Sequence, residues 1–129
     1  MDIANRMIAA ALVAFMAAPA IAQGGWTMVG QRDVTDRIDR DTITVEGRRR
    51  FTQVKLCVDR HAVRIRDFDV RFRNGGNQEV SVRDVVAAGA CTRDIALAGN
   101  GGRDIVNVAF SYEAASLGRE RAHIRLLAR

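Results

Sequence analysis

Two histidines, His61 and His123, are the side chains of this 129-residue chain best suited to act as bases or metal ligands. His123 falls on the solvent-facing side of an alternating run, and His61 falls in a predicted turn. A zinc site would need two further ligands, and no group of His, Cys and Asp has the usual spacing. Aspartates could pair as acid and base only in a shared cleft that separates their pKa values, and no such arrangement is visible. We therefore expect no catalytic residue, no metal site and no cofactor.

Arginine is the other residue type with marked chemistry. The formal net charge is +5, and nineteen arginines and one lysine carry the positive charge. The guanidinium fork suits phosphate, carboxylate and sulfate groups. A GC-rich coding bias would raise arginine together with alanine, glycine and aspartate, so a simple solvated surface is the alternative. The candidates for an anionic-ligand surface are Arg64, Arg71 and Arg73 on one face and Arg121 and Arg125 on another.

The meaning of the two cysteines, Cys57 and Cys91, depends on the compartment. In an exported protein an even number of cysteines indicates a disulfide, whereas in the cytosol two lone thiols would be separate buried groups. A redox-active pair is not expected, because the chain has no Cys-x-x-Cys motif. We predict a structural disulfide between Cys57 and Cys91.

Residues 7–22 indicate export. A positively charged start that includes Arg6 leads into an apolar run, which ends in Pro19 and the small-residue pattern Ala20-Ile21-Ala22. This is the layout of a signal peptide that is cleaved after Ala22. The run has about 16 residues, fewer than the roughly 20 that span a bilayer, so an uncleaved anchor is the minor alternative. We expect a signal peptide at 1–22 and a mature domain at 23–129, located in the periplasm or secreted, with no membrane anchor after cleavage.

The mature part is predicted to be a single all-β domain. Its segments alternate apolar and polar residues with a period of two, and none sustains the spacing of an amphipathic helix. Glycine-containing turns at 74–77 and 99–102 separate them. Short strands at intervals of about ten residues favour an antiparallel β-sandwich, jelly-roll-like or Greek-key, of about 7–9 strands. The alternating segments are 42–45, 53–58, 68–73, 80–82, 95–97, 106–113 and 121–126.

Two local features qualify this pattern. Val63 and Ile65 are odd-numbered apolar positions, whereas the apolar positions from Phe68 onward are even-numbered. A β-bulge at Arg66-Asp67, or a corner between sheets, would restore a common facing.

Trp26, close to the predicted mature start, is expected to close one end of the core, with ligand stacking as the alternative.

The mature chain resembles a family of small exported bacterial proteins of uncharacterised function. The resemblance covers nearly all of it and implies a small all-β periplasmic or secreted domain, with no activity to carry over. The resembling segments are Trp26-Thr27-Met28-Val29-Gly30, Asp39-Arg40-Asp41-Thr42-Ile43, 51–58, 70–75, 92–95, 103–108 and 122–124.

The function expected from these observations is a non-catalytic binding or structural module with an arginine-lined surface. Its partner would be an anionic envelope component, such as a lipid phosphate or an acidic polysaccharide, or another envelope protein. Nucleic acid is not expected, because aromatic stacking platforms are missing. Two alternatives remain. One is a small periplasmic hydrolase or lyase that uses Asp and His, and the other is an inhibitor or assembly partner that presents a sheet edge.

Overall fold

Two antiparallel sheets form the protein, as the sequence predicts. The computed structural model describes residues 22–23, 25–34, 38–114 and 121–129, so the predicted signal peptide lies outside the described residues except for Ala22. Seven of the described strands have six or more residues, which agrees with the expected 7–9. Sheet 1 has the order β1 (Ala22–Gln23), β2 (Trp26–Asp33), β10 (His123–Ala128), β5 (Gln53–Asp59) and β8 (Ile95–Ala96). Sheet 2 has the order β3 (Ile38–Thr44), β9 (Arg103–Ala114), β6 (Val63–Phe72) and β7 (Asn77–Val86), and β4 (Arg50–Phe51) pairs with the start of β9.

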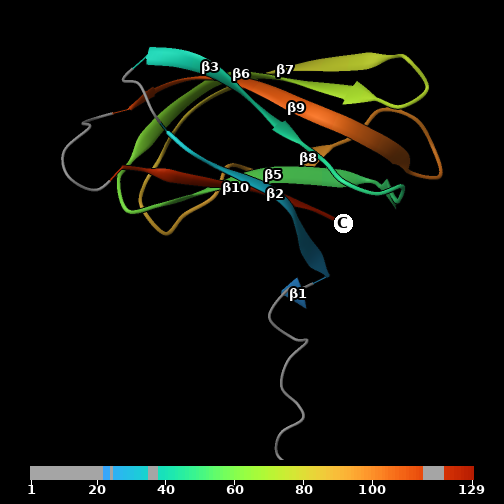
Figure 1. The fold of residues 1–129 in the computed structure, drawn as a ribbon, viewed down its shortest axis with the longest axis horizontal. Helices are drawn as coiled ribbons and strands as arrows, with labels where there is room; N and C mark the ends of the chain where they lie inside the picture. Colours follow the sequence, from blue (N-terminus) through green and yellow to red (C-terminus); the bar gives the residue numbers. More distant parts are fainter. Residues whose placement is uncertain (1–21, 24, 35–37, 115–120) are drawn as a thin grey trace, which may run out of the picture.

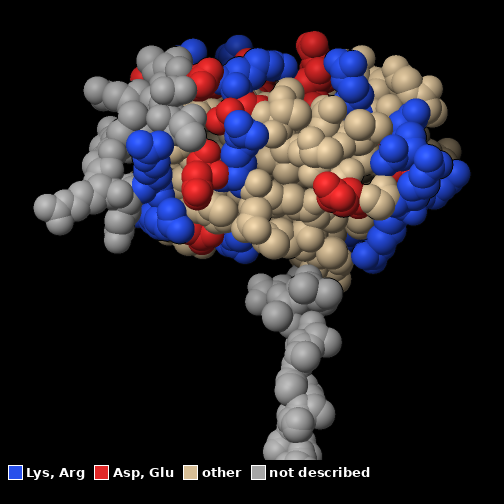
Figure 2. Space-filling view, in the orientation of Figure 1, with Lys and Arg blue, Asp and Glu red and all other residues tan. Residues whose placement is uncertain are grey.

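One hydrophobic core lies between the two sheets (Figure 1). Val54, Leu56 and Val58 of β5 enter it from sheet 1, and Val70 and Phe110 enter it from sheet 2. Each fully buried side chain of this kind contributes roughly 1.5–3 kcal/mol relative to exposure. Because neighbours along a strand point to opposite faces, most of the charged residues between these positions lie on the surface (Figure 2).

The bulge predicted at Arg66-Asp67 is present. Ile65 pairs with Tyr112 of β9, and Asp67 pairs with the adjacent Ser111, so Arg66 is an extra residue without a partner on β9. The extra residue resets the alternation of β6. As a result, the apolar residues on both sides of the bulge point into the core.

Trp26 is buried as expected, but its surroundings differ from the expected ones. The connected core cluster does not include it. Its ring lies 4.3 Å from the Lys55 ammonium and 4.6 Å from the Arg129 guanidinium. Lys55 alternates with the buried residues of β5, so its side chain and the contact with Trp26 lie on the outer side of sheet 1. The side chains of Lys55 and Arg129 therefore lie over the indole, and they leave little of its ring faces open for stacking with a ligand.

A buried polar group joins the two sheets on the side where β2 faces β3. The Tyr112 hydroxyl donates a 2.8 Å hydrogen bond to the Asp41 carboxylate, which is only 9% exposed. Arg32 of β2 lies 3.1 Å from the other oxygen of that carboxylate. Asp41 is thus satisfied from both sheets, as a buried charge must be.

The opposite side, between β7 and β8, is also joined by polar contacts. Gln78 of β7 donates to the carbonyl of Ala96 and accepts from the N–H of Ala98. The Arg93 guanidinium donates to the carbonyls of Ser81 and Val82, at 3.1 Å each. These contacts occupy part of the β7 edge that another strand would otherwise use.

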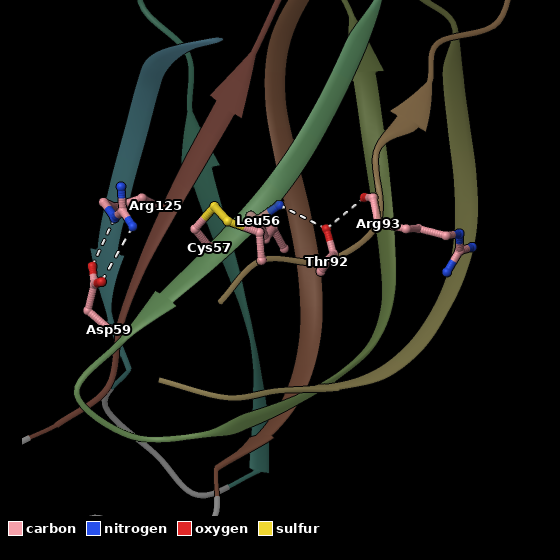
Figure 3. The surroundings of a disulfide bond; sticks show 7 residues. Leu56, Cys57, Asp59, Thr92, Arg93 and Arg125 are labelled. Carbon is pink, nitrogen blue, oxygen red and sulfur yellow. Dashed lines mark hydrogen bonds and ion pairs between the residues drawn. A yellow bond between two sulfur atoms is a disulfide. The ribbon is translucent and has the colours of Figure 1, made fainter. Parts of the chain in front are cut away.

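The predicted disulfide between Cys57 and Cys91 is present (Figure 3). It joins β5 to the segment that follows β7, and Cys57 and Cys91 also face each other as a β-bridge. The same segment hydrogen-bonds to β5 through Ala90 and Thr92, whose hydroxyl accepts from the N–H of Leu56. The disulfide therefore holds a segment with little strand structure against the edge of sheet 1. A disulfide is compatible with export.

Reducing the disulfide is expected to lower the free energy of unfolding by about 3–4 kcal/mol, because the unfolded chain regains the entropy of the closed loop. Urea denaturation of the wild-type protein with and without a thiol reductant measures this change. The double variant Cys57→Ala/Cys91→Ala is the control, since its unfolding should not respond to the reductant. Equal stability of the oxidised and reduced wild-type protein would contradict a structural role.

The variant Tyr112→Phe is expected to lose about 1–3 kcal/mol of stability, because it leaves the buried Asp41 carboxylate without one of its donors. Urea denaturation measures the loss. Thr44→Val, which removes a hydroxyl from an exposed position of β3, is the control and should stay within about 0.5 kcal/mol of the wild type. A loss no larger than that of the control would show that the hydrogen bond from Tyr112 to Asp41 adds no stability.

Candidate functional site

The five arginines predicted for an anionic surface fall on two sheets. Arg64 and Arg71 are exposed on β6, and Arg73 directly follows that strand. The other two belong to sheet 1, where Arg121 precedes β10 and Arg125 lies within it. The two groups lie on different sheets, so they do not form a single patch.

Three of these arginines are engaged by carboxylates on their own sheets: Arg125, Arg64 and, as described below, Arg73. Arg125 makes two hydrogen bonds to Asp59 of β5, at 2.8 and 3.4 Å (Figure 3). Arg64 lies 3.8 Å from Glu113 of β9, which also lies 3.7 Å from Arg66. Pairing with a neighbouring acid weakens the attraction of such a side chain for an external anion.

Arg73 has a different environment, because it lines an open pocket of about 460 Å³ at one end of the sandwich. Two further arginines share this pocket, and neither was a candidate in the sequence. We call it the arginine pocket, and it is lined by Arg50, Phe72, Arg73, Asn74, Asn100, Gly102, Arg103 and Asp104. Figure 2 shows positive side chains gathered at the right-hand end of the molecule, where Figure 1 shows the β6–β7 turn and the loop before β9.

Backbone pairing with the start of β9 brings the three arginines together. Arg50 of β4 pairs with Asp104, and the N–H of Arg73 donates to the carbonyl of Asp104 at 2.9 Å. Gly102 makes the close approach of β4 possible. It has a φ of +85°, and a Cβ atom there would lie 3.0 Å from the Cβ of Arg50. Other residues are disfavoured at this position by both the backbone conformation and the space.

Contacts with fixed groups hold the three guanidiniums in place. Arg103 lies 3.7 Å over the Phe72 ring and donates to the carbonyl of Ala98 at 2.7 Å. The guanidinium of Arg73 lies 3.2 Å from Asp104 and donates to the carbonyl of Gly47 at 3.0 Å. Arg50 makes a longer contact of 3.4 Å with the carbonyl of Gly101. Arg103 and Arg73 are therefore the more firmly oriented members.

The arginine pocket is electropositive. Three guanidiniums (+3) and the Asp104 carboxylate (−1) give the lining a formal charge of +2. Exposed Arg48 and Arg49 immediately precede Arg50 and add to the positive potential. Guanidinium and amide groups supply several hydrogen-bond donors, so the lining is suited to an oxyanion. The run Arg48-Arg49-Arg50 is the sequence signal that could have indicated this site.

A second open pocket, of about 340 Å³, lies at the bulge of β6. It is lined by Arg64, Arg66, Asp67 and Arg83. Arg83 has a φ of +51°, a conformation that residues other than glycine seldom adopt. Glu113 and Asp67 offset two of the three positive charges here, so the arginine pocket is the stronger candidate for an anion.

His123 and Asp33 form the Asp/His pair that bears on the hydrolase alternative. Nδ1 of His123 lies 2.7 Å from Oδ1 of Asp33, and Nε2 lies 2.8 Å from Oε1 of Gln31. Both ring nitrogens are therefore engaged with neighbours, and neither pocket described above is lined by a histidine. His61 lies in the predicted turn after β5, where its backbone N–H donates to the carbonyl of Asp59.

Among the described residues, no group of three or more His, Cys, Asp or Glu side chains could hold a metal ion. The same part of the chain contains no helix that is long and apolar enough to cross a membrane.

The hydrogen bond from His123 holds the pKa of Asp33 below its ordinary value of 3.8, and the positive charges of His123, Arg60 and Arg121 act in the same direction. We expect His123→Gln to raise the pKa of Asp33 toward 3.8, as followed by NMR titration of the side-chain carboxyl. A lowered pKa in the folded state contributes stability above the unfolded pKa and loses it as the pH falls through the folded pKa. The stability difference between the wild type and Asp33→Asn should accordingly shrink below about pH 4. An unchanged pKa in His123→Gln would contradict the assignment.

Comparison with known proteins gives a family but no activity. No curated protein matches this chain in sequence. Among solved structures, the chain is similar to one described as "Structural and functional characterization of Pseudomonas aeruginosa AlgX", with a TM-score of 0.47 and 12% identity. The match covers 80% of this chain but only 27% of that one. The family model of the domain of unknown function DUF2541 matches residues 7–128, and this chain therefore belongs to the DUF2541 family.

Proposed function

We propose that this protein is an exported, non-catalytic binding module that holds an anionic group of the cell envelope in the arginine pocket. The observation that carries the proposal is the gathering of Arg50, Arg73 and Arg103 around one open pocket with a single carboxylate. An electropositive concave site raises the local concentration of anions and binds them through charge-assisted hydrogen bonds. A lipid phosphate or an acidic polysaccharide would supply such a group.

Export is supported by two independent features of the chain. The layout of residues 7–22 is that of a cleaved signal peptide. The disulfide between Cys57 and Cys91 forms and persists in oxidising compartments such as the periplasm or the extracellular medium. An envelope ligand would be accessible in either place.

A binding role fits the arginine pocket better than a catalytic one. Its polar lining consists of guanidinium, amide and carboxylate groups, and the Asp104 carboxylate is paired with Arg73. The His123–Asp33 pair lies on a different part of the molecule and already engages both ring nitrogens. Neither arrangement offers a free base beside a pocket, which acid–base catalysis would need.

Protein partners that add a strand have less support. The β7 edge is partly occupied, because Arg93 donates to the carbonyls of Ser81 and Val82. A pairing strand would have to displace that guanidinium. An anion at the arginine pocket needs no such rearrangement.

We expect the variant Arg50→Gln to weaken binding of polygalacturonate or of phosphatidylglycerol vesicles about tenfold, because a charge-assisted hydrogen bond is worth roughly 1.5–3 kcal/mol. Binding by the wild type should also weaken between ionic strengths of about 0.01 and 0.15 M, since salt screens exposed charges. Microscale thermophoresis or vesicle co-sedimentation measures both effects.

The matched control is Arg121→Gln, which removes the same charge from an exposed position before β10, outside both pockets. It should bind like the wild type. Equal losses in Arg50→Gln and Arg121→Gln would show only general electrostatic attraction. No binding at low salt would overturn the proposal, and a loss confined to Arg64→Gln would assign the ligand to the outer face of β6.

A further inference from the structure

We propose that the arginine pocket selects a terminal phosphate monoester in its dianionic form, in preference to sulfate esters and carboxylates. This inference rests on the proposed function and adds the chemical class of the ligand. The juxtaposition that carries it is two guanidiniums, Arg50 and Arg103, that have no acidic partner among the described residues, beside a third, Arg73, whose charge is balanced by Asp104.

The charge balance of the pocket favours a dianion. Asp104 lies 3.2 Å from the Arg73 guanidinium, so that pair is close to neutral as a unit. Arg50 and Arg103 make no ion pair within the described part of the chain. Two positive charges are therefore left for the ligand. A phosphate monoester carries a charge of about −1.5 to −2 at pH 7, whereas a sulfate ester or a carboxylate carries −1.

The hydrogen-bonding character of the lining favours a phosphate monoester over a carboxylate. Its side chains supply guanidinium N–H groups and the amides of Asn74 and Asn100, while Oδ2 of its one carboxylate, Asp104, is paired with Arg73. A phosphate monoester offers three acceptor oxygens and a carboxylate only two. Donors of this kind suit a ligand that accepts many hydrogen bonds.

Arg103 has the most firmly held guanidinium of the pocket. Arg103 stacks on Phe72 and donates to the carbonyl of Ala98, and its Nη2 lies 3.5 Å from the Asn74 amide oxygen. A side chain that is oriented before binding loses less conformational entropy when the ligand arrives. Its remaining N–H groups can then bind an oxyanion at little entropic cost.

The pocket is open and lies at the end of the sandwich, so a phosphate could enter while the group that bears it stays outside. The same chemistry could come from a lipid headgroup or from a soluble phosphate ester. The test therefore includes a soluble probe and a membrane probe.

The soluble probes are phenyl phosphate and phenyl sulfate, which share size and tetrahedral shape but differ in charge. Isothermal titration calorimetry of the mature, oxidised protein should show phenyl phosphate binding at least about tenfold more tightly than phenyl sulfate at pH 7.5. The preference should fall away near pH 5, because the second pKa of a phosphate monoester is about 6. The charged groups facing the ligand are Arg50 from β4, Arg73 after β6, and Arg103 and Asp104 from β9, and no histidine lines the pocket. The loss of the preference for phenyl phosphate between pH 7.5 and pH 5 would therefore report protonation of the ligand.

Two variants distinguish binding in the arginine pocket from nonspecific electrostatic attraction to the protein surface. Arg50→Gln should reduce the preference for phosphate over sulfate at least threefold, because one of the two unpaired charges is lost. Arg121→Gln should leave the preference unchanged, and thermal unfolding confirms that both variants are folded. An unchanged preference in Arg50→Gln would overturn the assignment to this pocket.

The membrane probes are vesicles that contain phosphatidic acid, a phosphate monoester, or phosphatidylglycerol, a diester. Stronger binding to phosphatidic acid supports the proposal with a lipid as the source. Binding of phenyl phosphate without a preference for phosphatidic acid vesicles supports it with a soluble ester as the source. Equal or tighter binding of phenyl sulfate at pH 7.5 overturns the monoester inference and leaves the proposed function intact. If polygalacturonate, both vesicle types and both phenyl esters all fail to bind, the proposed function falls as well.

Discussion

The core shared by the two sheets is the constraint on which the rest of this structure depends. Strands β5, β6 and β10 give alternate side chains to that core, and most of the residues between them face outward. The space between the sheets is filled by residues such as Leu56, Val70 and Phe110, which are at most 1% exposed. The arginine pocket therefore lies at one end, where loops meet, and the smaller pocket lies on an outer face. The bulge at Arg66 is a consequence of the same constraint, since it keeps both halves of β6 facing the core.

The arginines of this chain have several distinct roles. Arg32 neutralises the buried Asp41 between the sheets, and Arg93 occupies the β7 edge. Arg125 and Arg64 pair with acids on the surface of their own sheets, and exposed pairs of that kind add little stability. Of the two pockets described, the one at the end of the sandwich has the larger excess of arginines over acids. Abundance alone therefore says little about function, because the local count of opposite charges decides which arginines are available to a ligand.

The arginine pocket is built by the same interactions that hold the fold together. The start of β9 pairs with β4 and accepts a hydrogen bond from the N–H of Arg73, so the lining cannot rearrange without loss of backbone hydrogen bonds. Phe72 both enters the core cluster and supports the Arg103 guanidinium. A binding site supported in this way is largely formed before the ligand arrives, which lowers the entropic cost of binding.

The sequence by itself determined the all-β class, an irregularity at Arg66-Asp67 and the pairing of Cys57 with Cys91, and the structure decided that the irregularity is a bulge and not a corner between sheets. Period-two alternation and its change of parity are local signals, so neighbouring residues are enough to interpret them, whereas the cysteines were interpreted from the export signal and from their number, since two cysteines allow one pairing. The sequence also singled out Arg73 but not Arg50 or Arg103. Those residues lie 23 and 30 positions from Arg73, and only the pairing of β4 with β9 brings them to one pocket. The tertiary structure also decided that Arg64 and Arg125 face acids across neighbouring strands, because strand order and register cannot be derived from alternation within a single strand.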